Sequence, residues 1–578
     1  MLPRPDRPVN IAGISHTVHG SAAALVRDRE VVAGALEERF DRRKFSAVFP
    51  QRALDFVTRY GRVGLEDIDA FAYFMSSANF VQALNRPFSE RLRFYPEAYF
   101  SFPNYVLPAV HDPDYQYVEQ SFVTGGHRRR FYYIDHHTAH AAQAFFASPF
   151  DEAAILTLDG RGDGVCGSLG IGRGKHIEQL VRIPFPHSIG QFYSTFTEFI
   201  GFTPNSDEYK LMGLAAYGDP TRLYDAVRRL LVTHDDGTFE LDLTYFAFYQ
   251  PGPKKFNSKF VEAFGEPRRS DEDPYGRFAD IAAACQKVTE ESVLDLLRAL
   301  YRRTGLRDLC YGGGVALNSL ANGRILRETP FERVYIPADP ADSGVAIGAA
   351  LYATCEINGG ERPRPLLQDY LGPGYDDDHV NEFLASNNIR ARRVEDPSAA
   401  AAELVAAGKV VGWMQGRLEF GPRALGDRSI LADPRRAEMK HVVNTKVKFR
   451  EPYRPFAPSV SVEAVDRYFE AHPSLSAPGS PTDFMIYVLP VREEQLESIP
   501  AVTHQDGTGR VQTVRRETNP RYWDLLRAFE QITGHPVVLN TSFNVKDEPI
   551  VLSPADAVRC FFSSGLDHLI LGDQVIDK

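Results

Sequence analysis

Two histidines, His136 and His140, lie four residues apart in an alanine-rich segment that is compatible with an α-helix. Residues i and i+4 share one face of a helix, so both imidazoles would point in the same direction. Asp159, at the end of a predicted strand, and Asp342, in a turn, could add oxygen ligands. Such a set suits a divalent ion such as Fe, Mn or Zn, whereas the spacing of the histidines alone favours a helix end that faces solvent.

Basic residues gather in the last third of the chain, within segments rich in glycine and proline. Residues 415–429 contain three arginines, and residues 446–456 contain two lysines and two arginines. Guanidinium and ammonium groups on rigid loops bind phosphate esters through paired hydrogen bonds and charge. Two polar segments, 503–512 and 540–544, follow predicted strands. We therefore expect phosphate binding here rather than a solvated basic surface.

A glycine-rich run follows a short predicted strand and precedes a predicted helix. Such a layout can present backbone N–H groups and a helix N-terminus to a phosphate. The run lacks the Gly-Lys-Ser/Thr of a Walker motif, and a glycine-rich loop alone is more typical of a tight turn. The candidate nucleotide-binding residues in this run are Gly312, Gly313, Gly314 and Asn318.

Alternating β and α patterns place these residues on an α/β framework over residues 8–355. Three short β-rich runs near the start return in a comparable layout later, which indicates either an internal duplication or two unrelated meanders. The runs are 10–14, 22–27 and 30–37, and then 154–159, 165–171 and 177–183. Residues 277–303 have apolar spacing suited to one long helix.

The chain of 578 residues is too long for one hydrophobic core, so we expect at least two domains. Glycine, proline and acidic residues interrupt the pattern near residue 360. We predict a first domain over 1–360, a linker over 361–377 and a second α/β domain over 378–578.

The composition excludes several classes of protein. Hydrophobic residues make up 43% and charged residues 24%, as in an ordinary globular protein. The net charge of −11 disfavours broad binding to nucleic acid or to anionic membranes. Five dispersed cysteines give no disulfide framework and no CxxC site. With no apolar leader or membrane-length apolar run, we expect a cytoplasmic location.

Seven separated motifs, taken in order along the chain, resemble those of the O-carbamoyltransferases of natural-product biosynthesis, the NodU/CmcH family. Agreement at several motifs is far more specific than agreement at one. The matching segments are 37–44, 135–142, 208–218, 312–318, 419–429, 454–458 and 540–544.

The resemblance implies a duplicated, actin-like ATPase fold followed by a smaller YrdC-like α/β domain. It implies that ATP and carbamoyl phosphate give carbamoyl adenylate in the C-terminal domain, and that the carbamoyl group then passes to a hydroxyl of a secondary metabolite in the N-terminal domain. Iron is the implied ion at the His/Asp set, and Mg²⁺ would accompany ATP. The residues implied to bind carbamoyl phosphate and ATP are Arg423, Lys448, Arg454, Arg510 and Asn540.

A general base must remove the proton of the acceptor hydroxyl, and His19 is the candidate because an imidazole titrates near neutral pH. Lys44 would lie beside it as an electrostatic partner. Relatives commonly carry an acidic residue after this histidine, whereas Gly20 follows it here. A substrate-binding or structural role for His19 therefore stays open.

Two other interpretations compete with O-carbamoyl transfer. One is a metal-dependent hydrolase or kinase of the actin-like fold, and the other is a non-catalytic regulator that binds nucleotide and iron. The aromatic stretch between residues 71 and 117 suggests an apolar wall for a macrolide, polyketide or glycosylated acceptor. The expected partners are small molecules, with a homodimer allowed.

Overall fold

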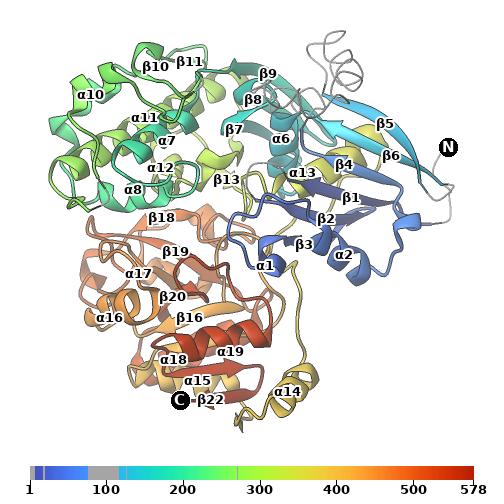
Figure 1. The fold of residues 1–578 in the computed structure, drawn as a ribbon, viewed down its shortest axis with the longest axis vertical. Helices are drawn as coiled ribbons and strands as arrows, with labels where there is room; N and C mark the ends of the chain where they lie inside the picture. The colour runs from blue at the N-terminus through green and yellow to red at the C-terminus, as the bar shows by residue number, and fades with distance from the viewer. Residues whose placement is uncertain (1–6, 17–19, 76–115, 125–126, 251, 270) are drawn as a thin grey trace.

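The structure is a computed structural model, and it describes residues 7–16, 20–75, 116–124, 127–250, 252–269 and 271–578. Figure 1 shows two lobes, which we call the N-terminal lobe (residues 7–357) and the C-terminal lobe (residues 377–578). Both contain helices and strands, so the predicted α/β class is confirmed. Within the described ranges, every helix is too short or too polar to serve as a membrane span.

The first sheet of the N-terminal lobe has six strands in the order β3-β2-β1-β4-β6-β5. They are β1 (Asn10–Ser15), β2 (Ala22–Arg27), β3 (Glu30–Leu36), β4 (Ala70–Tyr73), β5 (Tyr117–Thr124) and β6 (His127–Ile134). β1, β2 and β3 form an antiparallel meander, and β4 is parallel to both β1 and β6. The three β-rich runs predicted at the start of the chain are therefore strands.

The second sheet has five strands in the order β13-β12-β7-β8-β9. They are β7 (Glu152–Gly162), β8 (Val165–Arg173), β9 (His176–Pro184), β12 (Asp308–Gly312) and β13 (Arg333–Tyr335). β7, β8 and β9 form an antiparallel meander, and β12 is parallel to both β7 and β13. This order and sense repeat those of the first sheet from β3 to β6, which favours a duplication over two unrelated meanders.

Two small-residue helices, α6 (His136–Phe146) and α13 (Val345–Tyr352), lie between these sheets (Figure 1). They pack against each other, α13 also against β1 and α6 against β7. The close approach depends on the absence of a side chain at Gly348, where a Cβ would come 2.0 Å from the carbonyl oxygen of Ala139. Every residue of both helices is buried, including the histidines of α6.

The rest of the N-terminal lobe is largely helical. Its helices are α1 (Glu38–Asp41), α2 (Gln51–Tyr60), α7 (Ile189–Phe199), α8 (Glu208–Ala215), α9 (Tyr224–Arg228), α10 (Ser258–Phe264), α11 (Arg277–Thr304) and α12 (Ser319–Glu328), and β10 (Leu231–Thr233) pairs with β11 (Phe239–Leu241). The long helix predicted over 277–303 is α11, which packs against α7, α8 and α12.

The C-terminal lobe is built on one mixed sheet of nine strands in the order β14-β22-β21-β15-β16-β20-β17-β19-β18. They are β14 (Arg392–Arg393), β15 (Val411–Met414), β16 (Arg428–Ala432), β17 (Ala457–Ser461), β18 (Tyr487–Pro490), β19 (Thr508–Val514), β20 (Val537–Ser542), β21 (His568–Leu571) and β22 (Gln574–Asp577). Its helices are α14 (Asp377–Ser386), α15 (Pro397–Ala406), α16 (Glu438–Val442), α17 (Val465–Tyr468), α18 (Pro520–Thr533) and α19 (Pro554–Ser563), and a π-helix, Val443–Lys448, follows α16.

The two lobes share direct contacts. The Asn322 side chain in α12 donates to the carbonyl oxygen of Ile486 at 2.9 Å, and Lys210 in α8 lies 3.5 Å from Glu451. Residues 358–376 connect the lobes without a helix or strand, and their backbone bonds to both. One cluster of buried apolar residues extends through both lobes. The division into domains 1–360 and 378–578 stays a prediction.

Candidate functional site

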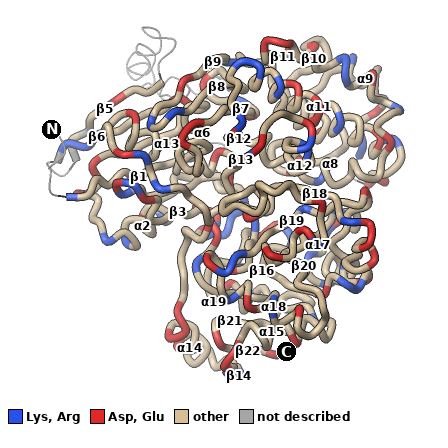
Figure 2. The backbone as a smooth tube through the Cα atoms, turned by 180° about the vertical axis from the view of Figure 1, so that it is seen from behind, with Lys and Arg blue, Asp and Glu red and all other residues tan. Residues whose placement is uncertain are grey.

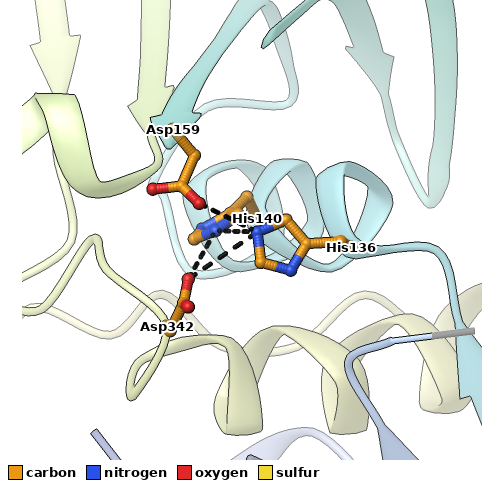
Figure 3. A group of neighbouring side chains, drawn as sticks. All are labelled: His136, His140, Asp159 and Asp342. Carbon is orange, nitrogen blue, oxygen red and sulfur yellow. Dashed lines mark hydrogen bonds and ion pairs between the residues drawn. The ribbon is translucent and has the colours of Figure 1, made fainter. Parts of the chain in front are cut away.

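Figure 3 shows the four predicted metal ligands converging from helix α6, strand β7 and the turn before α13. One ligand atom from each of His136, His140, Asp159 and Asp342 lies within 4.8 Å of the others, and we call this group the His/Asp cluster. The two histidine Nε2 atoms are 3.1 Å apart. Asp342 Oδ1 lies 3.6 Å from the Nε2 of His136 and 3.5 Å from that of His140.

Hydrogen bonds and close packing hold this cluster in place. The backbone N–H of His136 donates to Asp163 Oδ2 at 2.8 Å. The backbone N–H of Gly314 donates to Asp159 Oδ1 at 3.0 Å, while Asp159 Oδ2 lies 3.1 Å from His136 Nε2. A Cβ at Gly162 would come 2.0 Å from the ring of His136, so the end of β7 needs glycine there.

The His/Asp cluster attracts positive charge. Burial lowers the pKa of His136, but the hydrogen bond with Asp159 and the charges of Asp342 and Asp159 outweigh burial and raise this pKa to about 9. Asp342 Oδ1 is buried and receives no hydrogen bond from the described residues. Two imidazole nitrogens and two carboxylate oxygens therefore fit a divalent ion, which would supply the missing charge directly.

His137 is excluded as a further ligand by its own hydrogen bonds. Its Nδ1 lies 2.7 Å from the hydroxyl oxygen of Thr157, and its Nε2 lies 3.1 Å from the carbonyl oxygen of Val165. Burial and the charges of the neighbouring histidines lower the pKa of His137 to about 3. Because both ring nitrogens are engaged elsewhere, His137 is a buried structural residue.

The glycine-rich run lies against the His/Asp cluster. The N–H of Gly313 donates to the carbonyl oxygen of Pro340 at 2.9 Å, and the N–H of Gly314 is bonded to Asp159 as described above. The side chain of Asn318 caps α12 and pairs with Gln286. These donors bind protein atoms in the present structure, and nucleotide binding by Gly312, Gly313, Gly314 and Asn318 stays a prediction.

A second group, of opposite charge, lies where the lobes meet, and we call it the cation cluster. Its members are Lys44, Arg423, Lys448, Arg450, Arg454 and Arg510. Across the described chain, the only carboxylate within 4.0 Å of these groups is Glu451, 3.5 Å from Arg454. Figure 2 shows basic and acidic positions mixed over both lobes, so the cluster is not part of a generally basic face.

The cationic groups act on one another. Burial lowers the pKa of Arg510, and the charges of Arg423, Arg450 and Arg454 lower it further. Burial and the charge of Arg454 lower the pKa of Arg423 to about 10, although the charge of Asp339 acts in the opposite direction. Like charges that lack carboxylate partners repel each other in a partly buried site. The cluster therefore gains free energy from an anion that neutralises several of its charges at once.

Two predicted phosphate-binding residues make extensive contacts with the protein itself. The ammonium of Lys448 lies within hydrogen-bonding distance of four oxygens of Ser542 and Asn544, between 2.5 and 3.1 Å. Asn540 donates through Nδ2 to Gln512 at 2.9 Å, whereas its Oδ1 is buried and receives no hydrogen bond from the described residues. Lys448 thus holds the chain after β20, and Asn540 retains a free acceptor.

Sequence reasoning assigned Lys44 to the transfer site beside His19, and it did not single out Arg450 or Tyr209. His19 lies outside the described residues. The Lys44 Nζ lies 6.0 Å from the ring centroid of Tyr209, and the guanidinium of Arg454 lies 4.6 Å from the same ring. Arg450 lies in the same basic segment as Lys448, and Tyr209 lies in the family-like motif 208–218, so both segments carried a signal although neither residue was singled out.

Comparisons with known proteins agree with the motifs. Residues 10–351 match the family model described as Carbamoyltransferase N-terminus, and residues 402–578 match Carbamoyltransferase C-terminus. Nodulation protein NolNO of Sinorhizobium fredii is 39% identical over 568 residues, covering 97% of this chain and 79% of the relative. The 3'-hydroxymethylcephem-O-carbamoyltransferase of Streptomyces clavuligerus is 28% identical, covering 96% of each chain.

Similarity to solved structures is weaker. Component A of (R)-2-hydroxyglutaryl-CoA dehydratase from Acidaminococcus fermentans has a TM-score of 0.33 and 15% identity, covering 60% of this chain and 98% of its own. That likeness does not inform the fold, so the actin-like and YrdC-like assignments stay predictions. The family matches span most of the sequence. This chain belongs to the carbamoyltransferase family, and the protein is a carbamoyltransferase.

Proposed function

We propose that the protein is an ATP-dependent O-carbamoyltransferase that works in two steps at two sites. Carbamoyl phosphate and ATP form carbamoyl adenylate at the cation cluster, and the carbamoyl group then passes to a hydroxyl of a secondary metabolite at the His/Asp cluster. The observation that carries this proposal is a pair of sites with opposite unmet charge in a single carbamoyltransferase chain. A macrolide, polyketide or glycoside is the proposed class of acceptor.

The cation cluster supports the first step through charge. Carbamoyl phosphate loses its phosphate to water, and the resulting carbamate displaces pyrophosphate from the α-phosphate of ATP. In-line displacement at phosphorus depends mainly on positioning and on neutralising charge. Arg423, Arg454 and Arg510 would bind the phosphates, and Mg²⁺ would accompany ATP. The free Oδ1 of Asn540 can accept a hydrogen bond from a bound N–H donor.

The His/Asp cluster supports the second step. His136, His140, Asp159 and Asp342 would hold Fe²⁺ or another divalent ion, which when bound supplies Lewis-acid polarisation of a carbonyl or phosphate oxygen. The acceptor hydroxyl must lose a proton as its oxygen attacks the carbamoyl carbon, and AMP is the leaving group. His19 remains the proposed base, since the flanking Gly20 lies against Ser343, next to Asp342 in the chain.

The fold assignments belong to this proposal. The N-terminal lobe would be the duplicated, actin-like transfer domain, which is supported by the repeated strand order of its two sheets. The C-terminal lobe would be the YrdC-like domain that forms the adenylate. Joining both on one chain would let an unstable mixed anhydride pass between sites without release.

The first step can be tested without knowing the acceptor. The protein is incubated with ATP, Mg²⁺ and labelled pyrophosphate, with and without carbamoyl phosphate, and label entering ATP is measured. We expect exchange only when carbamoyl phosphate is present. Absence of this exchange would remove the proposed adenylation, whereas a hydrolase would release product without ATP. Screening hydroxylated metabolites for the mass of one added carbamoyl group then identifies the acceptor.

A further inference from the structure

The segment from residue 43 to residue 49, which we call the 43–49 loop, exposes three large apolar side chains. Phe45, Val48 and Phe49 are 38%, 48% and 46% exposed. Single exposed apolar residues are normal on a protein surface, but three within five positions form a patch. The helix α2 that follows buries its own apolar residues against the first sheet, so the patch is not needed to anchor the loop.

One end of this loop is connected to the His/Asp cluster by ring contacts. The ring of Phe49 lies 5.5 Å from that of His16, and His16 lies 5.3 Å from Tyr73. Tyr73 lies 5.2 Å from Phe74, and Phe74 lies 5.4 Å from His136. These centroid distances place the exposed Phe49 at the outer end of an aromatic path that begins at a predicted metal ligand.

The other end of the loop reaches the cation cluster. The Lys44 Nζ lies 5.0 Å from the ring centroid of Phe45 and 6.0 Å from that of Tyr209. The guanidinium of Arg454 lies over the same Tyr209 ring. The apolar patch therefore lies between the two charged sites. An acceptor bound in this region would lie beside both the site where the carbamoyl group is activated and the site where it is delivered.

The loop is held rigidly in its exposed conformation. Phe45 has a left-handed φ of 57°, which is uncommon outside glycine. Its N–H donates to Glu38 Oε2 at 2.8 Å, and the Ser46 hydroxyl donates to Asp41 Oδ2 at 2.6 Å. The N–H of Ser21 donates to the carbonyl oxygen of Ser46 at 3.0 Å. A strained loop fixed by several hydrogen bonds is typical of a preorganised binding surface.

We propose that Phe45, Val48 and Phe49 bind an apolar part of the acceptor, so that the acceptor is an amphipathic, hydroxylated small molecule. This inference rests on the proposed function and adds the chemical character of its substrate. With roughly 150–250 Å² per aromatic side chain, the exposed parts total on the order of 250 Å². A stable protein interface needs about 800 Å² per partner, so the patch fits a small molecule and not a second copy of the chain.

The test compares two hydroxylated probes that differ only in an apolar group, benzyl β-D-glucopyranoside and methyl β-D-glucopyranoside. Their dissociation constants are measured by titration calorimetry on the full chain, on Phe45→Ser and on Phe49→Ser. Phe562→Ser in α19 is the matched control, because Phe562 is 54% exposed and lies outside this patch. We expect the wild type and the control to bind the benzyl compound at least about tenfold more tightly.

Both loop variants should lose that preference while keeping carbamoyl phosphate-dependent pyrophosphate exchange, which also shows that they are folded. Equal binding of the two probes by the wild type, including no binding of either, overturns the inference. So does a preference that survives in both variants. Loss of exchange in the wild type would instead contradict the proposed function, so the two failures are distinguishable.

Discussion

The His/Asp cluster and the cation cluster differ in the sign of the charge that they lack, and the pKa values of the histidines beside them are shifted in opposite directions. Beside the carboxylates, the pKa of His136 rises to about 9 in spite of burial. Near Arg510, burial lowers the pKa of His504 to about 4; the charge of Asp506 acts in the opposite direction, and that of Arg510 lowers this pKa further. The contrast teaches that the two clusters lack charge of opposite sign, which supports the proposed metal ion at one and the proposed phosphates at the other.

The largest expected effect is at Arg423. Arg423→Ala should lower carbamoyl phosphate-dependent pyrophosphate exchange by about 100-fold to 1,000-fold, since a partly buried charge that stabilises the transferring phosphate is lost. Transfer from pre-made carbamoyl adenylate should persist. Arg516→Ala, at an exposed arginine outside the cluster, is the control and should keep both rates. Loss of both steps in Arg423→Ala would contradict separate sites.

The variant expected to have the opposite pattern of losses is His140→Ala. It should lower carbamoyl transfer to the acceptor by at least about 100-fold and reduce bound metal, since a direct ligand contributes more than a residue that only orients one. Pyrophosphate exchange should be unchanged. Metal content is measured by elemental analysis of the purified protein, with His176→Ala as an exposed control. Retention of full metal content would remove His140 from the ligand set.

The lowered pKa of His504 should make the free energy of unfolding depend on pH, an effect of intermediate size. Its ring is neutral when folded, with a pKa of about 4 against 6.5 in a model peptide. Below pH 6.5 the unfolded chain therefore binds a proton that the folded chain does not, so stability falls as pH decreases. From pH 7 to pH 5 this amounts to about 2 kcal/mol.

Urea unfolding of wild type and His504→Gln at both pH values measures the effect, because the difference between the two proteins cancels the other titrating groups. The variant should lose less stability on acidification. An equal loss in both proteins would show that folding does not lower the pKa of His504, against the effect of its burial.

The smallest expected effect is that of Lys44→Ala, which tests to which of the two sites Lys44 belongs. Lys44→Ala should lower pyrophosphate exchange about tenfold, because one charge near the phosphates contributes on the order of 1 kcal/mol or slightly more. The reason is the shared contact of Lys44 and Arg454 with Tyr209. Exchange that stays intact while acceptor transfer falls would instead restore the sequence-based role of Lys44 beside His19.

Some of the site could be predicted from sequence because the signal is local. The spacing of His136 and His140 directly encodes two side chains on one helical face. The basic segments around Arg423 and Lys448 could likewise be recognised from their local content of arginine, lysine, glycine and proline. The duplicated meanders could be predicted as strands, since alternation of apolar residues depends on the nearest neighbours along the chain.

The rest depends on contacts between distant segments. Asp342 was a candidate ligand from the sequence, but its approach to α6 depends on the packing of α13 against α6, which no local pattern encodes. The contact of Lys44 with Tyr209 and Arg454 joins segments from both lobes. The hydrogen bond from Gly314 to Asp159 also gives the glycine-rich run a contact that composition alone did not indicate.

The most direct test of two separate sites is pyrophosphate exchange in wild-type protein stripped of transition metal by a chelator and then supplied with Mg²⁺. The account predicts carbamoyl phosphate-dependent exchange within about twofold of the untreated protein, because changes at separate sites that share no contacts act nearly independently. Transfer to the acceptor should be lost. Exchange that disappears with the metal and returns when it is restored would contradict the account.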